Sequence, residues 1–364
     1  MTSSEDQTVR IWNASNGRER AALRGHTGVV TSVVWYDDDR QIASGSSDGT
    51  VKLWEAATLG ETPQIQVGDG IVNDLIWMSD GRRLAAAGSN GPVKLFDTHG
   101  RNQPAIFGGQ SASTRTMSLR SDGKLLASSD YSAVVQLWKI ASGAEVRTLS
   151  APAKPVHSAA FSRRGDLLAT ADDGGNICLW NTETGERLRT FGDPDFRCYS
   201  IAWSPDDMSL VSAWDDGRVR VYNAESGEMR WSVRAHSYAV NSVAWSFDGK
   251  SIASAGGDYL IQIFDAATGT GQRTLRGHTH SVFKMAWHPG GHRLASVSGD
   301  RSVRLWDVES GKLILSLLNH ESPMTTVAWS PDAKSLAAGS EIGTIFIYDS
   351  TSGYRATELE SAAP

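Results

Sequence analysis

The sequence predicts an all-β fold: an eight-bladed β-propeller of four-stranded antiparallel blades, with a surplus partial blade at one terminus. Two observations predict it, a repeat of 42 residues and four short strand patterns within each repeat. The repeat is seen most easily in the 13 Trp, because eleven of them fall into two columns with this spacing. Repeats of about 40–45 residues with four strands are typical of propeller blades.

The first column marks the end of a strand of alternating apolar residues, and an acid or amide follows it in most copies. Its nine aromatic residues are 42 apart, without insertion or deletion: Trp12, Trp54, Phe96, Trp138, Trp180, Tyr222, Phe264, Trp306 and Tyr348. The second column runs in step with the first: Trp35, Trp77, Trp203, Trp245, Trp287 and Trp329, with Leu119 and Phe161 at the other two places.

Residues 239–275 show how one period divides into strands. An alternating β-branched run at 239–246 is followed by a hairpin turn, with Gly249 where a positive φ is needed. Three further short strands follow, at 251–257, 260–265 and 272–275. Strands of this length between turn signals, with no helical spacing, predict an all-β fold. A single blade cannot bury both faces, so the blades are expected to pack in a ring.

Composition and charge exclude several classes of protein. The formal net charge is −6, which weighs against nucleic-acid binding. Two cysteines, Cys178 and Cys198, cannot form a disulfide framework or a four-ligand zinc site. No window has 18 consecutive apolar residues and the first residues carry no secretion signal, so we expect no membrane span and a cytoplasmic location.

The strand count leaves the closure of the ring open. There are nine third and fourth strands but eight first and second strands, which divides the chain into a partial blade at 1–24 and eight repeats at 25–364. Either residues 7–24 close the ring as a latch against the strands of 323–340, or residues 343–360 complete the last blade and residues 1–24 are spare. A first residue inside a repeat also favours a fragment of a longer chain.

The sequence resembles the WD-repeat β-propeller family over essentially its whole length. Gly25-His26, Gly277-His278 and Trp306-Asp307 match the Gly-His and Trp-Asp pairs of that family. The resemblance implies a buried structural network of His, Ser, Asp and Trp in each well-conserved blade. Its members here are His26, Ser44, Asp48 and Trp54; His278, Ser296, Asp300 and Trp306; and His236, Ser254 and Asp258, with Phe264 in place of Trp.

A catalytic interpretation of these His, Ser and Asp residues is disfavoured. The same set recurs in several blades, whereas a catalytic site is normally single. A buried imidazole needs a partner for each nitrogen, and a buried indole N–H needs an acceptor, which a structural network supplies. We therefore expect no enzyme activity, no cofactor and no metal site.

One rim of the propeller is the candidate binding face. In the family, the loops before the first strand and between the second and third strands share this rim, and here they are rich in aromatic and acidic residues. The predicted face comprises Trp214, Asp215, Asp173, Tyr131, Phe196, Tyr199, Tyr238, His280 and Phe283. Aromatic residues among acids suit a basic or aromatic-anchored peptide.

We therefore expect a non-catalytic scaffold that binds a partner protein or peptide on this face, as a monomeric ring or as the sensor part of a larger signalling protein. Two alternatives stay open. One is an enzyme or ligand site in the central channel, which a cluster of His or carboxylates there would support. The other is a structural array that assembles with copies of itself.

Overall fold

The computed structural model consists of strands and turns. It describes residues 1–12, 14, 17, 19–36, 41–55, 64–66, 70–89, 91–98, 104–107, 113–150, 154–318, 320–350 and 357–359. These residues contain 35 strands and no helix, as the strand patterns of the sequence predict. Accordingly, no helix in this part of the chain could cross a membrane.

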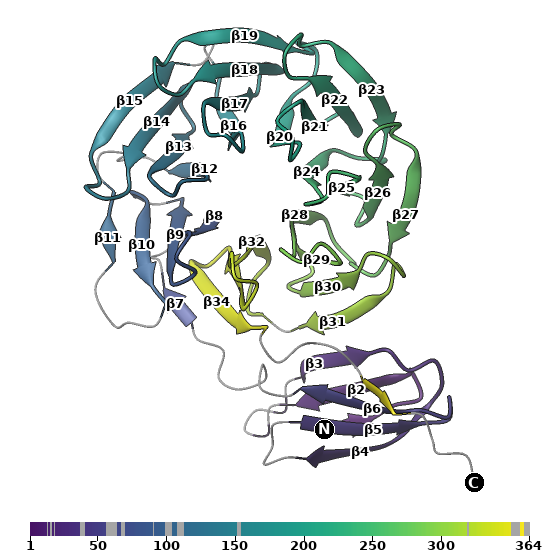
Figure 1. Ribbon diagram of the computed structural model, residues 1–364. Helices are drawn as coiled ribbons and strands as arrows, with labels where there is room; N and C mark the ends of the chain where they lie inside the picture. Colours follow the sequence, from purple (N-terminus) through teal and green to yellow (C-terminus); the bar gives the residue numbers. More distant parts are fainter. Residues whose placement is uncertain are drawn as a thin grey trace.

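Seven four-stranded antiparallel blades form a closed ring, six as separate sheets and one, β28–β31, as part of a larger sheet (Figure 1). Their innermost strands β8, β12, β16, β20, β24, β28 and β32 contact one another in this order, and β32 contacts β8 to close the circle. The first six ring blades are β8 (Val72–Trp77), β9 (Arg83–Gly88), β10 (Lys94–Asp97) and β11 (Ala105–Ile106); β12 (Thr114–Leu119), β13 (Leu125–Asp130), β14 (Val134–Lys139) and β15 (Glu145–Ser150); β16 (Val156–Phe161), β17 (Leu167–Asp172), β18 (Asn176–Asn181) and β19 (Arg187–Gly192); β20 (Cys198–Trp203), β21 (Ser209–Trp214), β22 (Arg218–Asn223) and β23 (Met229–Arg234); β24 (Val240–Trp245), β25 (Ser251–Gly256), β26 (Ile261–Asp265) and β27 (Gly271–Leu275); and β28 (Val282–Trp287), β29 (Arg293–Ser298), β30 (Val303–Asp307) and β31 (Leu313–Leu317).

The seventh ring blade combines strands from both ends of the chain. It contains β32 (Met324–Trp329), β33 (Ser335–Ser340) and β34 (Thr344–Asp349), and its outermost strand is β7 (Gln64–Gln66). The pairing of β7 with β34 joins Ile65 to Ile345. Residues near the start of the chain therefore complete the blade formed by its end.

An eighth four-stranded sheet lies outside the ring. It consists of β4 (Val30–Tyr36), β5 (Gln41–Ser46), β6 (Val51–Glu55) and β35 (Thr357–Leu359). Eight blade sheets are thus present, as the repeat predicts, but only seven form the circle. The place next to β32 is already taken, because β8 packs there and Trp77 donates its indole N–H to the carbonyl of Ala328 at 3.2 Å.

The seventh ring blade and the outer blade have exchanged their fourth strands. By the 42-residue spacing, β7 follows β6 in its own repeat and β35 follows β34. In the structure Val51 of β6 pairs with Leu359 of β35, while Ile345 of β34 pairs with Ile65 of β7. This exchange connects the outer blade to the ring.

The N-terminal strands extend a ring blade at its outer edge. The strands β1 (Thr2–Ser3), β2 (Thr8–Trp12) and β3 (Glu19–Arg24) pair in order, and β3 pairs with β31 to give a seven-stranded sheet. The latch of residues 7–24 against 323–340 does not form in the structure, because β3 pairs with β31 and β7 holds the edge of β34. The strands β1, β2 and β3 lie outside the ring, as the other alternative predicts. That alternative is wrong in completing the last blade from C-terminal sequence, because β7 supplies its fourth strand and β35 pairs with β6.

Neighbouring blades are joined by a repeated contact of the second tryptophan column. In five ring blades the indole N–H donates to a backbone carbonyl of the preceding innermost strand, at 2.9–3.3 Å. The donors and acceptors are Trp77 and Ala328, Trp203 and Ala160, Trp245 and Ala202, Trp287 and Ala244, and Trp329 and Ala286. The contact both buries a large apolar ring between two blades and gives its polar N–H a hydrogen-bond acceptor.

Candidate partner-binding face

The buried polar network forms in three blades. In the outer blade, His26 Nδ1 lies 2.9 Å from Asp48 Oδ2, and His26 Nε2 lies 2.8 Å from Ser44 Oγ. The indole N–H of Trp54 donates to the same Ser44 Oγ at 2.7 Å. Since the carboxylate accepts from Nδ1–H, the hydroxyl can accept from the indole and donate to Nε2. A neutral imidazole then has a partner for each nitrogen.

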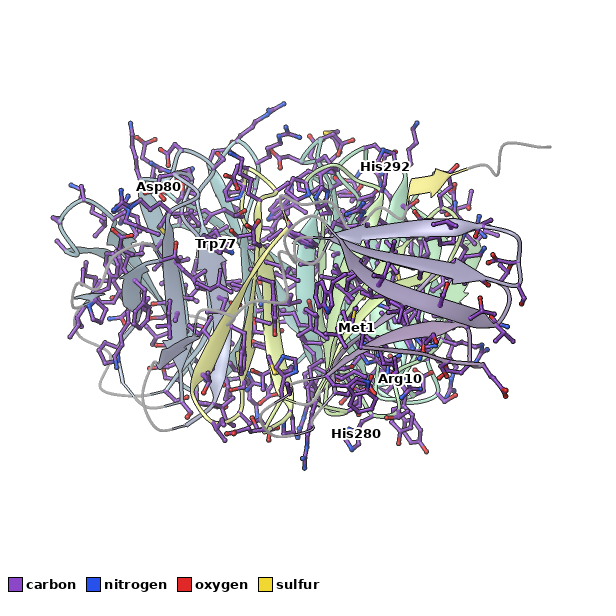
Figure 2. All side chains as sticks on the ribbon, turned by 90° about the horizontal axis from the view of Figure 1, so that it is seen from below. Met1, Arg10, Trp77, Asp80, His280 and His292 are labelled. Carbon is purple, nitrogen blue, oxygen red and sulfur yellow. The ribbon has the colours of Figure 1, made fainter. Side chains whose placement is uncertain are left out.

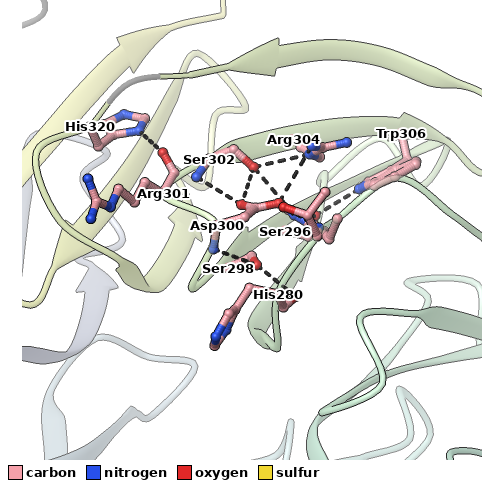
Figure 3. A network of polar contacts seen from close by, with 11 residues as sticks. His280, Ser296, Ser298, Asp300, Arg301, Ser302, Arg304, Trp306 and His320 are labelled. Atoms are coloured by element: carbon pink, nitrogen blue, oxygen red, sulfur yellow. Dashed lines mark hydrogen bonds and ion pairs between the residues drawn. The ribbon is translucent and has the colours of Figure 1, made fainter.

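The blade of β28–β31 shows how the carboxylate of Asp300 is held (Figure 3). Its oxygens accept from His278 Nδ1 at 2.8 Å, from the Ser302 hydroxyl at 2.6 Å and from the backbone N–H of Thr279 at 3.1 Å. Burial by itself raises the pKa of Asp300, but these hydrogen bonds outweigh it and hold the pKa far below the usual range. Burial lowers the pKa of His278, so the pair consists of a carboxylate and a neutral imidazole. Such a satisfied network stiffens the blade.

Trp214 does not lie on the surface, and its predicted exposure on the binding face is wrong. Its side chain is fully buried, its indole N–H donates to Ser212 Oγ at 2.7 Å, and the guanidinium of Arg220 lies 4.6 Å from the ring centre. In this blade Pro194 stands where other blades have His, and Tyr222 stands in the Trp column. The indole of Trp214 therefore takes the hydroxyl that the network His and Trp use elsewhere. Two features of the sequence could have indicated this buried position. Pro194 replaces the network His, and an additional Trp lies two residues after Ser212, which is at the place of the network Ser.

The other predicted aromatic residues of the face are accessible to solvent. Tyr131, Phe196 and Tyr238 are 55%, 37% and 68% exposed. His280 is exposed too, whereas Tyr199 and Phe283 are half-buried. Figure 2 shows His280 at one rim of the propeller, with Asp80 and His292 at the opposite rim.

The mouth patch, defined as Arg115, Tyr131, His157, Asp173, Arg197, Tyr199 and Asp215, is a continuous set of contacts. His157 contacts the carboxylate of Asp173, and its ring meets Tyr199 edge-on at 5.0 Å. Arg197 Nε lies 3.9 Å from Asp173, and the Arg197 carbonyl accepts from the backbone N–H of Asp215 at 3.1 Å. The patch therefore runs across the loops of at least two neighbouring blades.

Arg115 joins this patch to the central channel. Its guanidinium lies 5.1 Å from the ring centre of Tyr131, and it lines a cavity of 430 Å³ together with His157 and Tyr199. Burial lowers the pKa of Arg115. Burial, and then the nearby charge of Arg115, also lower the pKa of His157 despite its contact with Asp173. His157 is thus neutral at neutral pH, beside a permanent cation.

The acids of the rim are less available than their number suggests. Asp172 is buried and accepts from the backbone N–H groups of Gly174 and Asn176 within its turn. Asp173 contacts His157, as described above. Asp215 differs, because its Oδ1 is buried and has no hydrogen-bond partner among the described residues. That oxygen is out of reach of solvent, so it offers no site to an outside donor.

Within the described part of the chain, no three His, Cys, Asp or Glu side chains converge as metal ligands do. Cys178 and Cys198 are buried in strands, and burial raises the pKa of both thiols. At the channel wall Lys284 Nζ contacts Asp74 Oδ1 as an ion pair. The second oxygen of Asp74 accepts from the backbone N–H of Met117 at 2.8 Å, which ties together three blades at the channel wall.

Comparisons with protein families agree with this architecture. A model described as the IFT122 first beta-propeller matches residues 197–364, and the WD domain, G-beta repeat matches residues 17–55 and 143–181. A search of curated proteins gives no match. The chain belongs to the WD-repeat β-propeller family, whose members typically serve as scaffolds for protein interactions.

Proposed function

We propose that the propeller is a non-catalytic recognition module and that a peptide segment of a partner protein binds at the mouth patch. The observation that carries the proposal is the continuity of this patch. Arg115 lies over the ring of Tyr131 and shares the channel cavity with His157 and Tyr199. His157 contacts Asp173, and the backbone of Asp215 binds that of Arg197 on the rim. The exposed rings of Phe196 and Tyr238 lie on the same set of loops. The strands fix the ends of these loops, so little ordering entropy is lost on binding.

The chemistry of the patch suggests which groups the partner offers. The carboxylate of Asp173 stays 26% exposed beside the rings of the patch, so it suits an N–H or ammonium group of the partner. Exposed tyrosine and phenylalanine rings suit an aromatic or long apolar side chain as anchor. We infer a peptide with an apolar anchor beside a hydrogen-bond donor, which is consistent with a basic or aromatic-anchored partner.

The test is capture of partners from a native lysate by the parent chain and by a Tyr131→Ala, Tyr238→Ala variant. Both tyrosines are largely exposed, so the variant is expected to fold normally and to lose tenfold or more of its capture, as roughly expected when two anchors of an interface are truncated. Phe247→Ala is the matched control, because Phe247 is 55% exposed and lies in the turn between first and second strands, at the opposite rim. Equal capture by the double variant and the parent would reject the mouth patch.

A second candidate is a small-molecule site in the channel. The cavity of 430 Å³ favours it, since its size is within the range of about 300–1,000 Å³ typical of ligand pockets. Its wall combines the cation of Arg115 with the rings of Tyr199 and Phe283. Tyr238 does not line this cavity, so a ligand bound there would raise the melting temperature of a Tyr238→Ala variant as much as that of the parent, whereas a peptide anchored on Tyr238 would not.

A further inference from the structure

The outer blade and the N-terminal strands expose two tryptophans that their counterparts in the ring bury. Trp35 of β4 is 36% exposed, whereas Trp77, Trp203, Trp287 and Trp329 at the same place are 5–9% exposed. Trp12 of β2 is 38% exposed, whereas Trp138, Trp180 and Trp306 of the ring are 1–4% exposed. Both rings therefore lack a neighbour that the repeat normally provides.

The missing neighbour can be identified from the ring. In the ring, the second-column Trp of four blades donates to a carbonyl 43 residues earlier in the sequence, on the first strand of the preceding blade. No such acceptor faces Trp35 among the described residues. The sheet that precedes β4 is β1–β2–β3, and β1 and β2 contact β4 directly. This sheet has third and fourth strands, but only two residues at the place of a second strand and no first strand.

The register of β1 shows that this place is shaped for the same repeat. Ser3 pairs with Val9 and Thr2 with Arg10, as Val297 pairs with Val303 and Ser296 with Arg304 in the blade of β28–β31. The indole of Trp12 donates to Thr2 Oγ1 at 2.9 Å, as Trp306 donates to Ser296 Oγ at 2.8 Å. The two residues of β1 therefore keep the blade geometry of the ring.

We propose that the gap bounded by β1, by the end of β2 that β1 does not reach and by Trp35 of β4 is a docking site for a β-hairpin, formed by the first and second strands of another copy of this repeat. Such a hairpin extends β1 along the end of β2, covers Trp12 and offers a carbonyl to Trp35. It comes from repeat sequence outside residues 1–364. A second copy of this chain has no hairpin to give, because its eight described first strands are in use, seven in the ring and β4 in the outer blade.

With this hairpin in place, β1–β6 become two adjoining blades of a second propeller. This proposal does not depend on the proposed function, since it concerns strands outside the ring and uses no residue of the mouth patch.

The test adds the hairpin to the full chain. Residues 155–168 contain the first strand of one ring blade, its turn and the start of the second strand, and they contain no tryptophan. They are placed directly before Met1. This fusion continues β1 in register, because residue 169, which follows residue 168 in the chain, is the equivalent of Met1 four repeats later. Trp12 then faces the added Leu as Trp180 faces Leu168, and Trp35 meets the carbonyl that Ala160 offers to Trp203. The control carries one extra glycine before Met1, which shifts the strand by one residue and turns every side chain to the other face.

Hydrogen exchange and acrylamide quenching of tryptophan fluorescence are measured on both fusions and on the parent. The in-register fusion is expected to slow amide exchange in residues 2–3 and 11–12 by about tenfold or more, since β1 and the end of β2 gain strand partners, and to reduce quenching. The shifted fusion should behave like the parent, and exchange in β24–β27 should be the same in all three. Equal protection in both fusions, or in neither, overturns the proposal.

Discussion

Replacing Trp214 with alanine should destabilise the blade of β20–β23. The indole is fully buried, its N–H donates to Ser212 at 2.7 Å and its ring lies 4.6 Å from the guanidinium of Arg220. Truncation of a buried Trp to Ala costs about 3–5 kcal/mol through lost transfer energy and the cavity left behind. Trp214→Phe keeps most of the ring volume and should cost less, about 0.5–1.5 kcal/mol for the hydrogen bond alone, because Ser212 Oγ still donates to the carbonyl of Arg220 at 3.1 Å.

The assay for this prediction is urea unfolding of the parent, both Trp214 variants and Tyr238→Ala. Tyr238 is 68% exposed, so its truncation should change the free energy of unfolding by no more than about 0.5 kcal/mol. A Trp214→Ala variant as stable as Tyr238→Ala would show that the indole is on the surface and would refute the buried position. Loss of partner capture without loss of stability would point the same way.

Two further predictions concern pH and backbone conformation. Burial lowers the pKa of His278 and of His236 below the ordinary 6.5. As the pH falls, these imidazoles therefore take up a proton in the unfolded chain before they do so in the folded chain. The stability that they contribute is complete above about pH 6.5 and is lost as the pH falls through their pKa values in the folded chain. Urea midpoints from pH 8 to pH 5 should fall less in His278→Gln than in the parent, while His280→Gln, at an exposed position, should follow the parent. Gly217→Ala should be destabilising by more than about 1 kcal/mol, since Gly217 has a φ of 79° and a Cβ there would lie 2.3 Å from the carbonyl oxygen of His236. Gly249→Ala is its control, with a φ of 71° but no atom nearer than 3.5 Å to the added Cβ, and an equal loss in both variants would exclude the contact with His236 as the cause.

The repeat period predicted the strands because it reports directly on local structure. Turn residues and alternating apolar residues fix where each strand begins and ends, and Gly249 has the positive φ expected of its hairpin turn. The three His, Ser and Asp sets also form as the family pattern implies, because each set occupies fixed places in one blade and needs no information from beyond it.

The direction of the Trp214 side chain could not be predicted in the same way. Residue 214 ends the second strand, where the rim loop begins, and a side chain there can turn outward or into the blade. Which way it turns depends on the hydroxyl of Ser212 and on the space left by Pro194 and Tyr222, which are brought together by packing between strands. The pattern of one strand does not contain that information.

Ring closure was likewise beyond local patterns. The fourth strands β7 and β35 occupy equivalent places in two repeats, so either can pair with either third strand. The choice is decided by the number of blades whose inner strands fit around one channel. Seven inner strands complete the circle here, and the strands of 30–55 are left outside it.

The central claim is therefore a seven-bladed ring closed by an exchange of fourth strands, and thiol cross-linking tests it most directly. Ile65→Cys with Ile345→Cys should form a disulfide when the chain folds under oxidising conditions, because these residues are direct strand partners and no added reagent has to reach the buried position 345. Leu359→Cys with Ile345→Cys should not, since Leu359 pairs with Val51 in the outer blade. Cys178 and Cys198 are buried and serve as the internal background in both variants. A disulfide between residues 345 and 359, with none between 65 and 345, would contradict the exchange and place the last blade wholly in C-terminal sequence.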